Sequence, residues 1–217
     1  MLKIEECNES RSEDLEVKRI LTDTFNSNCY VITDQHLNRT IVIDPGSANL
    51  QLQISGGIDY ILLTHEHMDH LAGVNILMEE YHCKLLCTKL CSQVIADPRK
   101  NFSRYIKGKD YVCGPSDLLW EDIHDELHWN GNTIKCIRTP GHSPSSVCLA
   151  LCNYLFTGDT LIFDLPTVTK LPGGDKKALR SSIDFIIENF SPATTIYPGH
   201  GDPFLLRDIN RKIVFGE

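Results

Sequence analysis

The sequence lacks any long apolar segment. Nothing in its 217 residues approaches the run of about 18 apolar residues that a membrane-spanning helix requires. The N-terminal stretch MLKIEECNESRSEDLEV is polar and acidic, which is unlike a secretory signal. These two absences lead us to expect a cytoplasmic protein without a membrane partner.

Dense basic clusters are also missing. Lysine and arginine total 21 against 29 aspartates and glutamates, so the formal net charge is −8 at pH 7. A negative chain repels phosphate backbones unless a local basic patch overcomes that charge. We therefore expect no nucleic-acid partner, and the sequence leaves the oligomeric state open.

The nine cysteines do not indicate a disulfide scaffold. Their number is odd, and a chain of this size can build a core without disulfides, so we expect free thiols. The series Cys83, Cys87 and Cys91 has C-x3-C-x3-C spacing, which matches neither the C-x2-C zinc pattern nor a ferredoxin spacing. We interpret these three cysteines as small buried residues.

Composition and residue pattern predict a single α/β domain over residues 1–217. The hydrophobic share of 41% and charged share of 23% are typical of globular proteins. Strands are expected at 15–21, 28–33, 40–43, 58–63, 84–87, 126–129, 133–139, 146–151, 154–156 and 194–197. The first three should form an antiparallel meander. Helices are expected at 71–81, 88–96 and 175–190, and Asp175 is expected to cap the last of them. Two sets of strands with helices in two stretches predict two packed sheets covered by helices, a four-layer αββα sandwich.

The stretch 98–122 is irregular, with glycine, proline and scattered aromatics, and it is the best candidate for a lid. Its segment 101–117 carries residues that would reach a substrate, although long loops also use such residues for packing. They are Phe102, Tyr105, Lys107, Lys109 and Tyr111.

The strongest chemical signal directly follows the strand expected at 58–63. It is the segment from His65 to His70, HEHMDH. Residues two apart in an extended loop project to the same side, so His65 and His67 can bind one ion. Asp69 and His70 can then reach a second ion. Imidazole nitrogen and carboxylate oxygen suit zinc and also iron or manganese.

Three further candidate ligands each stand where an expected strand ends in a glycine-containing turn. They are His142 in TPGHS, Asp159 in FTGDT and His200 in YPGHG. Strand ends fix a side chain more precisely than loops, and glycine lets the backbone turn sharply to aim it. A carboxylate such as Asp159 can also bridge two ions.

Other histidines and one aspartate are weaker candidates. Asp44 in VIDPG would either orient a ligand histidine or simply form an Asp-Pro-Gly turn, and we favour the turn. The remaining histidines have no glycine turn or ligand neighbour at a suitable spacing, and we interpret them as structural or surface residues. They are His36, His82, His124 and His128.

These residues resemble the metallo-β-lactamase superfamily, whose H-x-H-x-D-H signature stands here at His65 to His70. Further landmarks follow in the family's order: NCYVI at 28–32, VIDPG at 42–46, TPGHS at 139–143, FTGDT at 156–160, LPGGD at 171–175 and YPGHG at 197–201. Within the superfamily the sequence is most similar to the glyoxalase II-like hydrolases, especially the compact group with TGDTL followed by LPGGD.

The resemblance implies the αββα fold of the superfamily and a centre with two divalent metal ions, zinc in the first place and iron or manganese otherwise. It implies that His65, His67 and His142 hold the first metal. Asp69, His70 and His200 would hold the second metal, and Asp159 would bridge the two. Asp69 would also act in catalysis by orienting the attacking hydroxide.

The implied activity is hydrolysis of a small-molecule thioester of the hydroxyacyl-glutathione type by a hydroxide that bridges the metals. Two alternatives stay open. One is a persulfide dioxygenase with a single iron on His65, His142 and Asp159, and the other is a metallo-hydrolase of another ester class.

Two features depart from the glyoxalase II pattern. Only 17 residues (217 − 200) follow His200, where longer enzymes carry a helical domain with glutathione contacts. An arginine often precedes LPGGD in the compact group, whereas this chain has Thr167, Val168, Thr169 and Lys170. We interpret Lys170 as an exposed, solvated residue.

Overall fold

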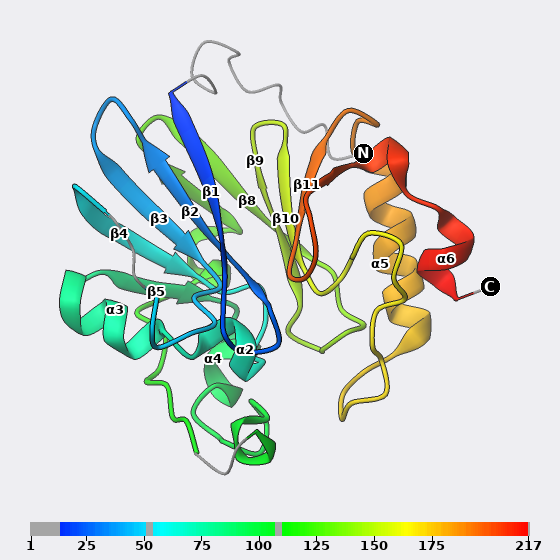
Figure 1. Cartoon of the computed structure of the whole chain (residues 1–217), viewed down its shortest axis with the longest axis horizontal. Helices are drawn as coiled ribbons and strands as arrows, with labels where there is room; N and C mark the ends of the chain where they lie inside the picture. The colour runs from blue at the N-terminus through cyan, green and yellow to red at the C-terminus, as the bar shows by residue number, and fades with distance from the viewer. Residues whose placement is uncertain (1–13, 51–53, 107–109, 217) are drawn as a thin grey trace. The chain divides into compact units, whose positions relative to one another are not determined.

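The computed structural model describes residues 14–50, 54–106 and 110–216, which fall into two compact units. The N-terminal unit spans Glu13–Asp125, and the C-terminal unit is built on Glu126–Glu217. Each unit contains one six-stranded sheet with its own helices (Figure 1). That residues 1–217 form a single domain stays a prediction.

The sheet of the N-terminal unit follows chain order. Its strands are β1 (Leu15–Leu21), β2 (Asn28–Asp34), β3 (Arg39–Ile43), β4 (Gly57–Leu62), β5 (Lys84–Cys87) and β6 (Leu118–Leu119). The first three strands pair antiparallel, which confirms the predicted meander, and β3 to β6 pair parallel. Parallel strands end at the same edge of a sheet, so the residues that follow β3 and β4 come together there.

The helices of the N-terminal unit pack on one face of this sheet. They are α2 (Met68–Leu71), α3 (Val74–Tyr81) and α4 (Lys89–Val94), with 3-10 turns η1 (Ser103–Tyr105) and η2 (Trp120–Ile123). Val74 and Leu77 of α3 join Val31, Ile61 and Leu85 of the strands in one core cluster. Strand residues of the opposite parity, such as Ile32 and Leu62, are buried as well. Both faces of the sheet are therefore apolar, as a sandwich requires.

The sheet of the C-terminal unit has the reverse order. Its strands are β7 (Glu126–Trp129), β8 (Asn132–Arg138), β9 (Val147–Leu151), β10 (Tyr154–Gly158), β11 (Thr195–Pro198) and β12 (Phe204–Leu205). All neighbours pair antiparallel except β10 and β11, which pair parallel. The residues that follow β10 and β11 therefore also meet at one edge.

Helix α5 (Lys176–Asn189) covers this second sheet together with the short α6 (Arg211–Phe215) (Figure 1). Asp175 caps α5 as predicted, because its carboxylate accepts hydrogen bonds from the amides of Lys177 and Ala178 at 2.8 and 3.0 Å. Leu179, Ile183 and Ile186 repeat at helical spacing and lie in the core cluster with strand residues of β9 to β11.

The structure differs from the expected elements mainly where a helix or strand is short or where the sequence pattern is irregular. The helix expected at 71–81 is divided at Gly73, where a Cβ would lie 2.4 Å from the carbonyl oxygen of Ser47. The irregular stretch 98–122 contains η1, β6 and η2, and the sequence pattern missed α6 and β12. None of the described helices is long and apolar enough to cross a membrane.

The structure confirms the interpretation of Cys83, Cys87 and Cys91 as small buried residues. Cys83, Cys87 and Cys91 are not in disulfide bonds and lie in the N-terminal core. Burial raises the pKa of the Cys83 thiol to about 11, which keeps the thiol protonated and a poor metal ligand at neutral pH. The expectation of free thiols is wrong for Cys152, which is in a disulfide bond.

Candidate metal centre

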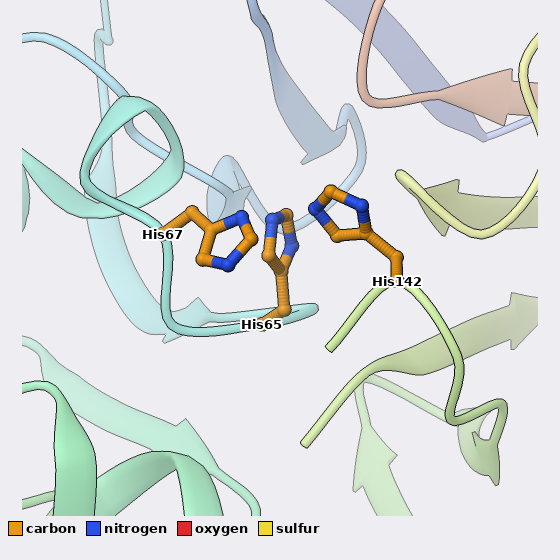
Figure 2. A group of neighbouring side chains, drawn as sticks. All are labelled: His65, His67 and His142. Carbon is orange, nitrogen blue, oxygen red and sulfur yellow. The ribbon is translucent and has the colours of Figure 1, made fainter. Parts of the chain in front are cut away.

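The N-terminal unit places its four predicted ligands on residues 64–70, which we call the ligand loop. His65, His67, Asp69 and His70 are all at most 9% exposed. The ring of His65 lies 4.7 Å from that of His67 and 4.3 Å from that of His70, measured between centroids. Figure 2 shows His65 and His67 side by side after β4. Burial of three imidazoles at such short range is characteristic of a ligand group rather than of surface histidines.

The second half of the ligand loop brings a carboxylate beside an imidazole. Asp69 Oδ2 lies 3.6 Å from His70 Nε2, and the two residues are the second and third of the four-residue helix α2. This separation exceeds that of an ordinary N–H···O hydrogen bond. Two ligand atoms each about 2.1 Å from one tetrahedral ion would lie about 3.4 Å apart. The spacing of Asp69 and His70 therefore fits a pair of ligands.

Asp44 organises the ligand loop from the end of β3. Its Oδ1 accepts the amide of Thr64 at 2.8 Å, and its Oδ2 accepts the Thr64 hydroxyl at 2.6 Å. His70 Nδ1 lies 3.1 Å from the same Oδ2. A carboxylate oxygen accepts, so His70 Nδ1 carries the proton and Nε2 keeps the lone pair that binds a metal. Asp44 thus orients His70, a predicted ligand, so our preference for a turn alone was wrong.

Thr64 fixes the tautomer of His65 in the same way. The Thr64 hydroxyl gives its proton to Asp44, so its oxygen can only accept from His65 Nδ1, which lies 3.0 Å away. His65 is therefore also fixed with its lone pair on Nε2. One carboxylate sets the protonation pattern of two ligand histidines, which is the arrangement seen around protein metal sites.

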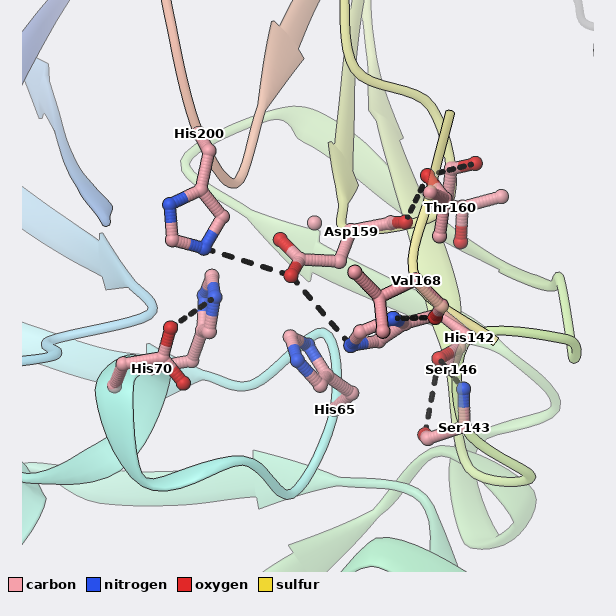
Figure 3. A network of polar contacts seen from close by, with 12 residues as sticks. His65, His70, His142, Ser143, Ser146, Asp159, Thr160, Val168 and His200 are labelled. Atoms are coloured by element: carbon pink, nitrogen blue, oxygen red, sulfur yellow. Dashed lines mark hydrogen bonds and ion pairs between the residues drawn. The ribbon is translucent and has the colours of Figure 1, made fainter. Parts of the chain in front are cut away.

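The C-terminal unit brings its three predicted ligands together around one oxygen. Asp159 Oδ2 lies 3.5 Å from His142 Nε2 and 3.5 Å from His200 Nε2. Figure 3 shows Asp159 between the two imidazoles, each contributed by a different loop. Both distances fit ligand pairs on a common ion, and one oxygen equidistant from two imidazoles is the geometry expected of a bridging carboxylate.

The loop after β10 orients two of these ligands. His142 Nδ1 lies 2.8 Å from the carbonyl oxygen of Val168, so this nitrogen donates and Nε2 is left to bind a metal (Figure 3). The hydroxyl of Thr167 donates to the carbonyl oxygen of Asp159 at 2.9 Å. Two consecutive residues thus fix the imidazole of one ligand and the backbone of another.

Glycines aim the ligands of both units. Gly141, directly before His142, has φ +144°, and a Cβ there would lie 2.3 Å from the backbone of Leu179. In the N-terminal unit, a Cβ on Gly46 would lie 1.7 Å from the carbonyl oxygen of Asp69. The predicted requirement for glycine is therefore confirmed at Gly141, and Gly46 adds a close approach that the sequence did not reveal.

The donor set fits divalent metal ions. Imidazole nitrogens and carboxylate oxygens suit zinc, iron and manganese, and the outer partners leave Nε2 of His65, His70 and His142 as the binding atom. Each unit thus holds a group of predicted ligands whose side chains are already oriented, four residues in one unit and three in the other. The partners Thr64, Thr167 and Val168 escaped sequence reasoning, because a hydroxyl or a carbonyl carries no metal-binding signature.

Histidines outside the two groups have the structural roles expected of them. His82 ends α3 and His124 ends η2, both in left-handed backbone conformation. The exposed His128 has its Nδ1 3.0 Å from the hydroxyl of Thr133. The backbone amide of His36 donates to Asp34 at 3.0 Å.

The lid candidate is only partly described. Lys107 and Lys109 lie outside the described residues. The side chain of Tyr111 is partly buried and its hydroxyl accepts from the amide of Asn75 at 3.2 Å, which is a packing role. Lys170 is exposed, as interpreted.

Two mixed sheets with flanking helices and two imidazole–carboxylate groups at strand ends define a metal-binding α/β protein of the metallo-hydrolase class. A family model described as the metallo-beta-lactamase superfamily matches residues 22–200. The chain therefore belongs to the metallo-β-lactamase superfamily, whose members bind divalent metals. The predicted fold class is confirmed.

Known proteins similar to this chain are consistent with that assignment. A probable metallo-hydrolase of Methanocaldococcus jannaschii is 31% identical over 199 residues, covering 82% of this chain and 89% of the relative. A hydroxyacylglutathione hydrolase of Aeromonas hydrophila is 31% identical over 147 residues, which are 65% of this chain and half of that enzyme. A crystal structure of BLEG-1, a B3 metallo-beta-lactamase, superposes with a TM-score of 0.82 at 27% identity, covering 89% of this chain and 95% of that one.

Proposed function

We propose that the two ligand groups act together and hold two divalent metal ions. His65, His67 and His142 would hold the first ion, and Asp69, His70 and His200 the second. Asp159 would bridge them, because its Oδ2 lies 3.5 Å from both His142 Nε2 and His200 Nε2. This equidistant oxygen is the single observation that carries the proposal. Zinc is the metal we expect first, with iron or manganese as the alternatives.

The reaction we propose is hydrolysis of a thioester of the hydroxyacyl-glutathione type. A pair of bound divalent ions supplies hydroxide at neutral pH and stabilises the negative charge that develops on the attacked carbonyl oxygen. Asp69 would orient the attacking oxygen through its carboxylate. The departing thiolate needs little acid assistance, which agrees with a centre in which histidines and carboxylates are already committed as ligands.

The substrate class rests on family resemblance. The chain shares TGDTL and LPGGD with the compact glyoxalase II-like group, and it is similar to half of a hydroxyacylglutathione hydrolase. A small-molecule substrate in the cytoplasm, without nucleic-acid or membrane partners, completes the proposal. A net charge of −8 supports the exclusion of nucleic acid.

The alternative is a persulfide dioxygenase with one iron on His65, His142 and Asp159. Two of these residues, His142 and Asp159, already lie 3.5 Å apart in the C-terminal unit. Such an enzyme consumes oxygen and binds one metal per chain, whereas the hydrolase needs two metals and no oxygen. Oxygen uptake with a persulfide substrate therefore separates the two functions.

The test compares thioester hydrolysis by the zinc-loaded protein with that of Asp159→Ala. Since a direct ligand matters more than an outer partner, we expect a loss of at least about 100-fold. Asp208→Ala, the same change at an exposed position of the C-terminal unit, is the matched control and should keep full activity. Undiminished turnover by Asp159→Ala would rule out the assigned centre.

A further inference from the structure

Phe102 packs directly on a predicted metal ligand. Its ring lies 4.8 Å from the ring of His67, at an interplanar angle of 73°, in an edge-to-face contact. The side chain is only partly buried, and its backbone is left-handed with φ +63°. A bulky residue adopts this conformation rarely, and such outliers persist where the surrounding structure enforces them, often at functional sites.

The buried Asn101 holds the phenylalanine in this position. Its carbonyl oxygen accepts the amide of Met68, in the ligand loop, at 2.9 Å. Its side-chain amide donates to the carbonyl oxygens of Ile95 and Tyr111 at 2.8 and 2.9 Å, and its Oδ1 accepts the amide of Ser103 at 2.9 Å. These polar contacts fix the backbone of this segment without involving the Phe102 ring. The position of the backbone therefore does not depend on the ring.

A second aromatic side chain extends the surface formed by Phe102. The ring of Tyr105 lies 6.3 Å from that of Phe102, and Tyr105 is 69% exposed. The three rings of His67, Phe102 and Tyr105 therefore follow one another from a buried metal ligand to solvent. We call Phe102 and Tyr105 the aromatic pair.

We propose that the aromatic pair contacts an apolar group on the reacting carbonyl carbon, so that the enzyme prefers thioesters with aromatic or branched acyl groups over the acetyl thioester. This inference rests on the proposed function and narrows its substrate class. A substrate carbonyl bound at the metal on His67 would place its substituent near the ring of Phe102. Aromatic and apolar side chains beside a few polar groups are what binding sites use to select apolar ligands.

A purely structural role for Phe102 makes a different prediction. If the ring only orients His67, its removal weakens metal binding and lowers turnover of every substrate by the same factor. If the ring contacts the acyl group, its removal leaves metal binding intact and lowers only the preference for apolar substrates. Metal affinity, measured by competition with a chelator, therefore accompanies the test.

The first experiment measures binding of the two carboxylate products, phenylacetate and acetate, to the zinc-loaded full chain by calorimetry. We expect the wild type to bind phenylacetate more tightly, and Phe102→Ala to reduce the ratio of the two affinities about tenfold. Phe102→Gly, which tolerates the left-handed backbone, should give the same ratio and covers the case in which the alanine variant folds poorly.

Leu37→Ala is the matched control for loss of an exposed apolar side chain. Leu37 is 53% exposed and lies between β2 and β3, at the sheet edge opposite the one where β3 and β4 end. This variant should keep the wild-type ratio. Equal affinity of the wild type for both acids, or weaker zinc binding in both Phe102 variants with an unchanged ratio, would overturn the proposal.

The second experiment compares kcat/KM for the phenylacetyl and acetyl thioesters of N-acetylcysteamine. The Phe102 variants should lose about tenfold more with the phenylacetyl than with the acetyl substrate. If neither thioester is hydrolysed, the proposed function fails, and the affinity ratio for the two acids still decides the role of Phe102. Equal losses with both thioesters would contradict that role.

Discussion

The two units assemble their ligand groups in opposite ways. In the N-terminal unit all four ligands come from the contiguous run His65 to His70, whereas in the C-terminal unit His142, Asp159 and His200 each follow a different strand. A contiguous run depends on the local backbone and on one outer carboxylate, Asp44. Ligands from separate strands converge only when the sheet has formed, which makes the second group a product of tertiary structure.

The difference also appears in how the ligands are oriented. Asp44 fixes His70 directly and His65 through Thr64, so one side chain serves two ligands. In the C-terminal unit His142 Nδ1 donates to a backbone carbonyl, and the Thr167 side chain bonds the backbone of Asp159 rather than a ligand side chain. Substitution of an outer side chain should therefore lower metal affinity more in the N-terminal group than in the C-terminal group. Asp44→Asn and Thr167→Val test this difference.

The largest effect is expected for Asp44→Asn. Asparagine tolerates the left-handed backbone at this position, φ +52°, so the turn should survive. Its amide nitrogen cannot accept, so at least one of the donors from Thr64 and His70 loses its acceptor. We expect zinc affinity to fall by up to about 100-fold, measured by chelator competition. An unchanged affinity would show that Asp44 serves only the turn.

Thr167→Val should have a smaller effect on the C-terminal group. The substitution removes the hydrogen bond to the carbonyl oxygen of Asp159 but keeps the shape of the side chain. We expect a loss of about tenfold in zinc affinity, at the low end for an outer partner. Thr169→Val is the control, since the Thr169 hydroxyl makes no hydrogen bond within the described part of the chain. A loss larger than that of Asp44→Asn would reverse the comparison between the units.

The smallest effect is expected from two buried thiols, which make the free energy of unfolding depend on pH above about pH 9. Burial raises the pKa of Cys113 in the N-terminal unit and of Cys148 in the C-terminal unit to about 12, from 9.0. Above pH 9 the unfolded chain loses these protons while the folded chain keeps them, so the unfolded state binds fewer protons and stability falls as the pH rises.

Urea unfolding between pH 8 and 11 measures this slope. In Cys113→Ala and in Cys148→Ala the free energy of unfolding should fall less steeply with pH than in the wild type. Each substitution removes one thiol that titrates only in the unfolded chain over this pH range. If both variants keep the wild-type slope, these thiols are ionised equally in the folded and unfolded states.

Much of the fold followed from sequence because the strands are bounded by clear turns. The strands at 15–21, 84–87 and 126–129 and the cap at Asp175 were predicted at the observed residues. Two-residue strands such as β6 and β12 could not be predicted, since two residues are too few to show an alternation of apolar and polar side chains. The break at Gly73 likewise results from a tertiary contact with Ser47.

The ligand residues were predictable because imidazole and carboxylate groups at strand ends carry a recognisable chemical pattern. Their assignment to two metal positions stays a prediction. The outer partners were less accessible to sequence reasoning. The sequence favoured a turn at Asp44, and nothing in it marked Thr64 or Thr167 as a partner of a ligand, because threonine occurs in many unrelated settings. Phe102 was named only as one of several residues in an irregular loop.

The most direct test of the central claim is the metal content of the full chain. Wild-type protein and Asp159→Ala would be saturated with zinc, dialysed against metal-free buffer and analysed by mass spectrometry against protein concentration. We expect two ions per wild-type chain and fewer than two in the variant, because Asp159 would contribute to both positions. One ion in the wild type, or two ions retained by Asp159→Ala, would contradict a two-metal centre bridged by this carboxylate.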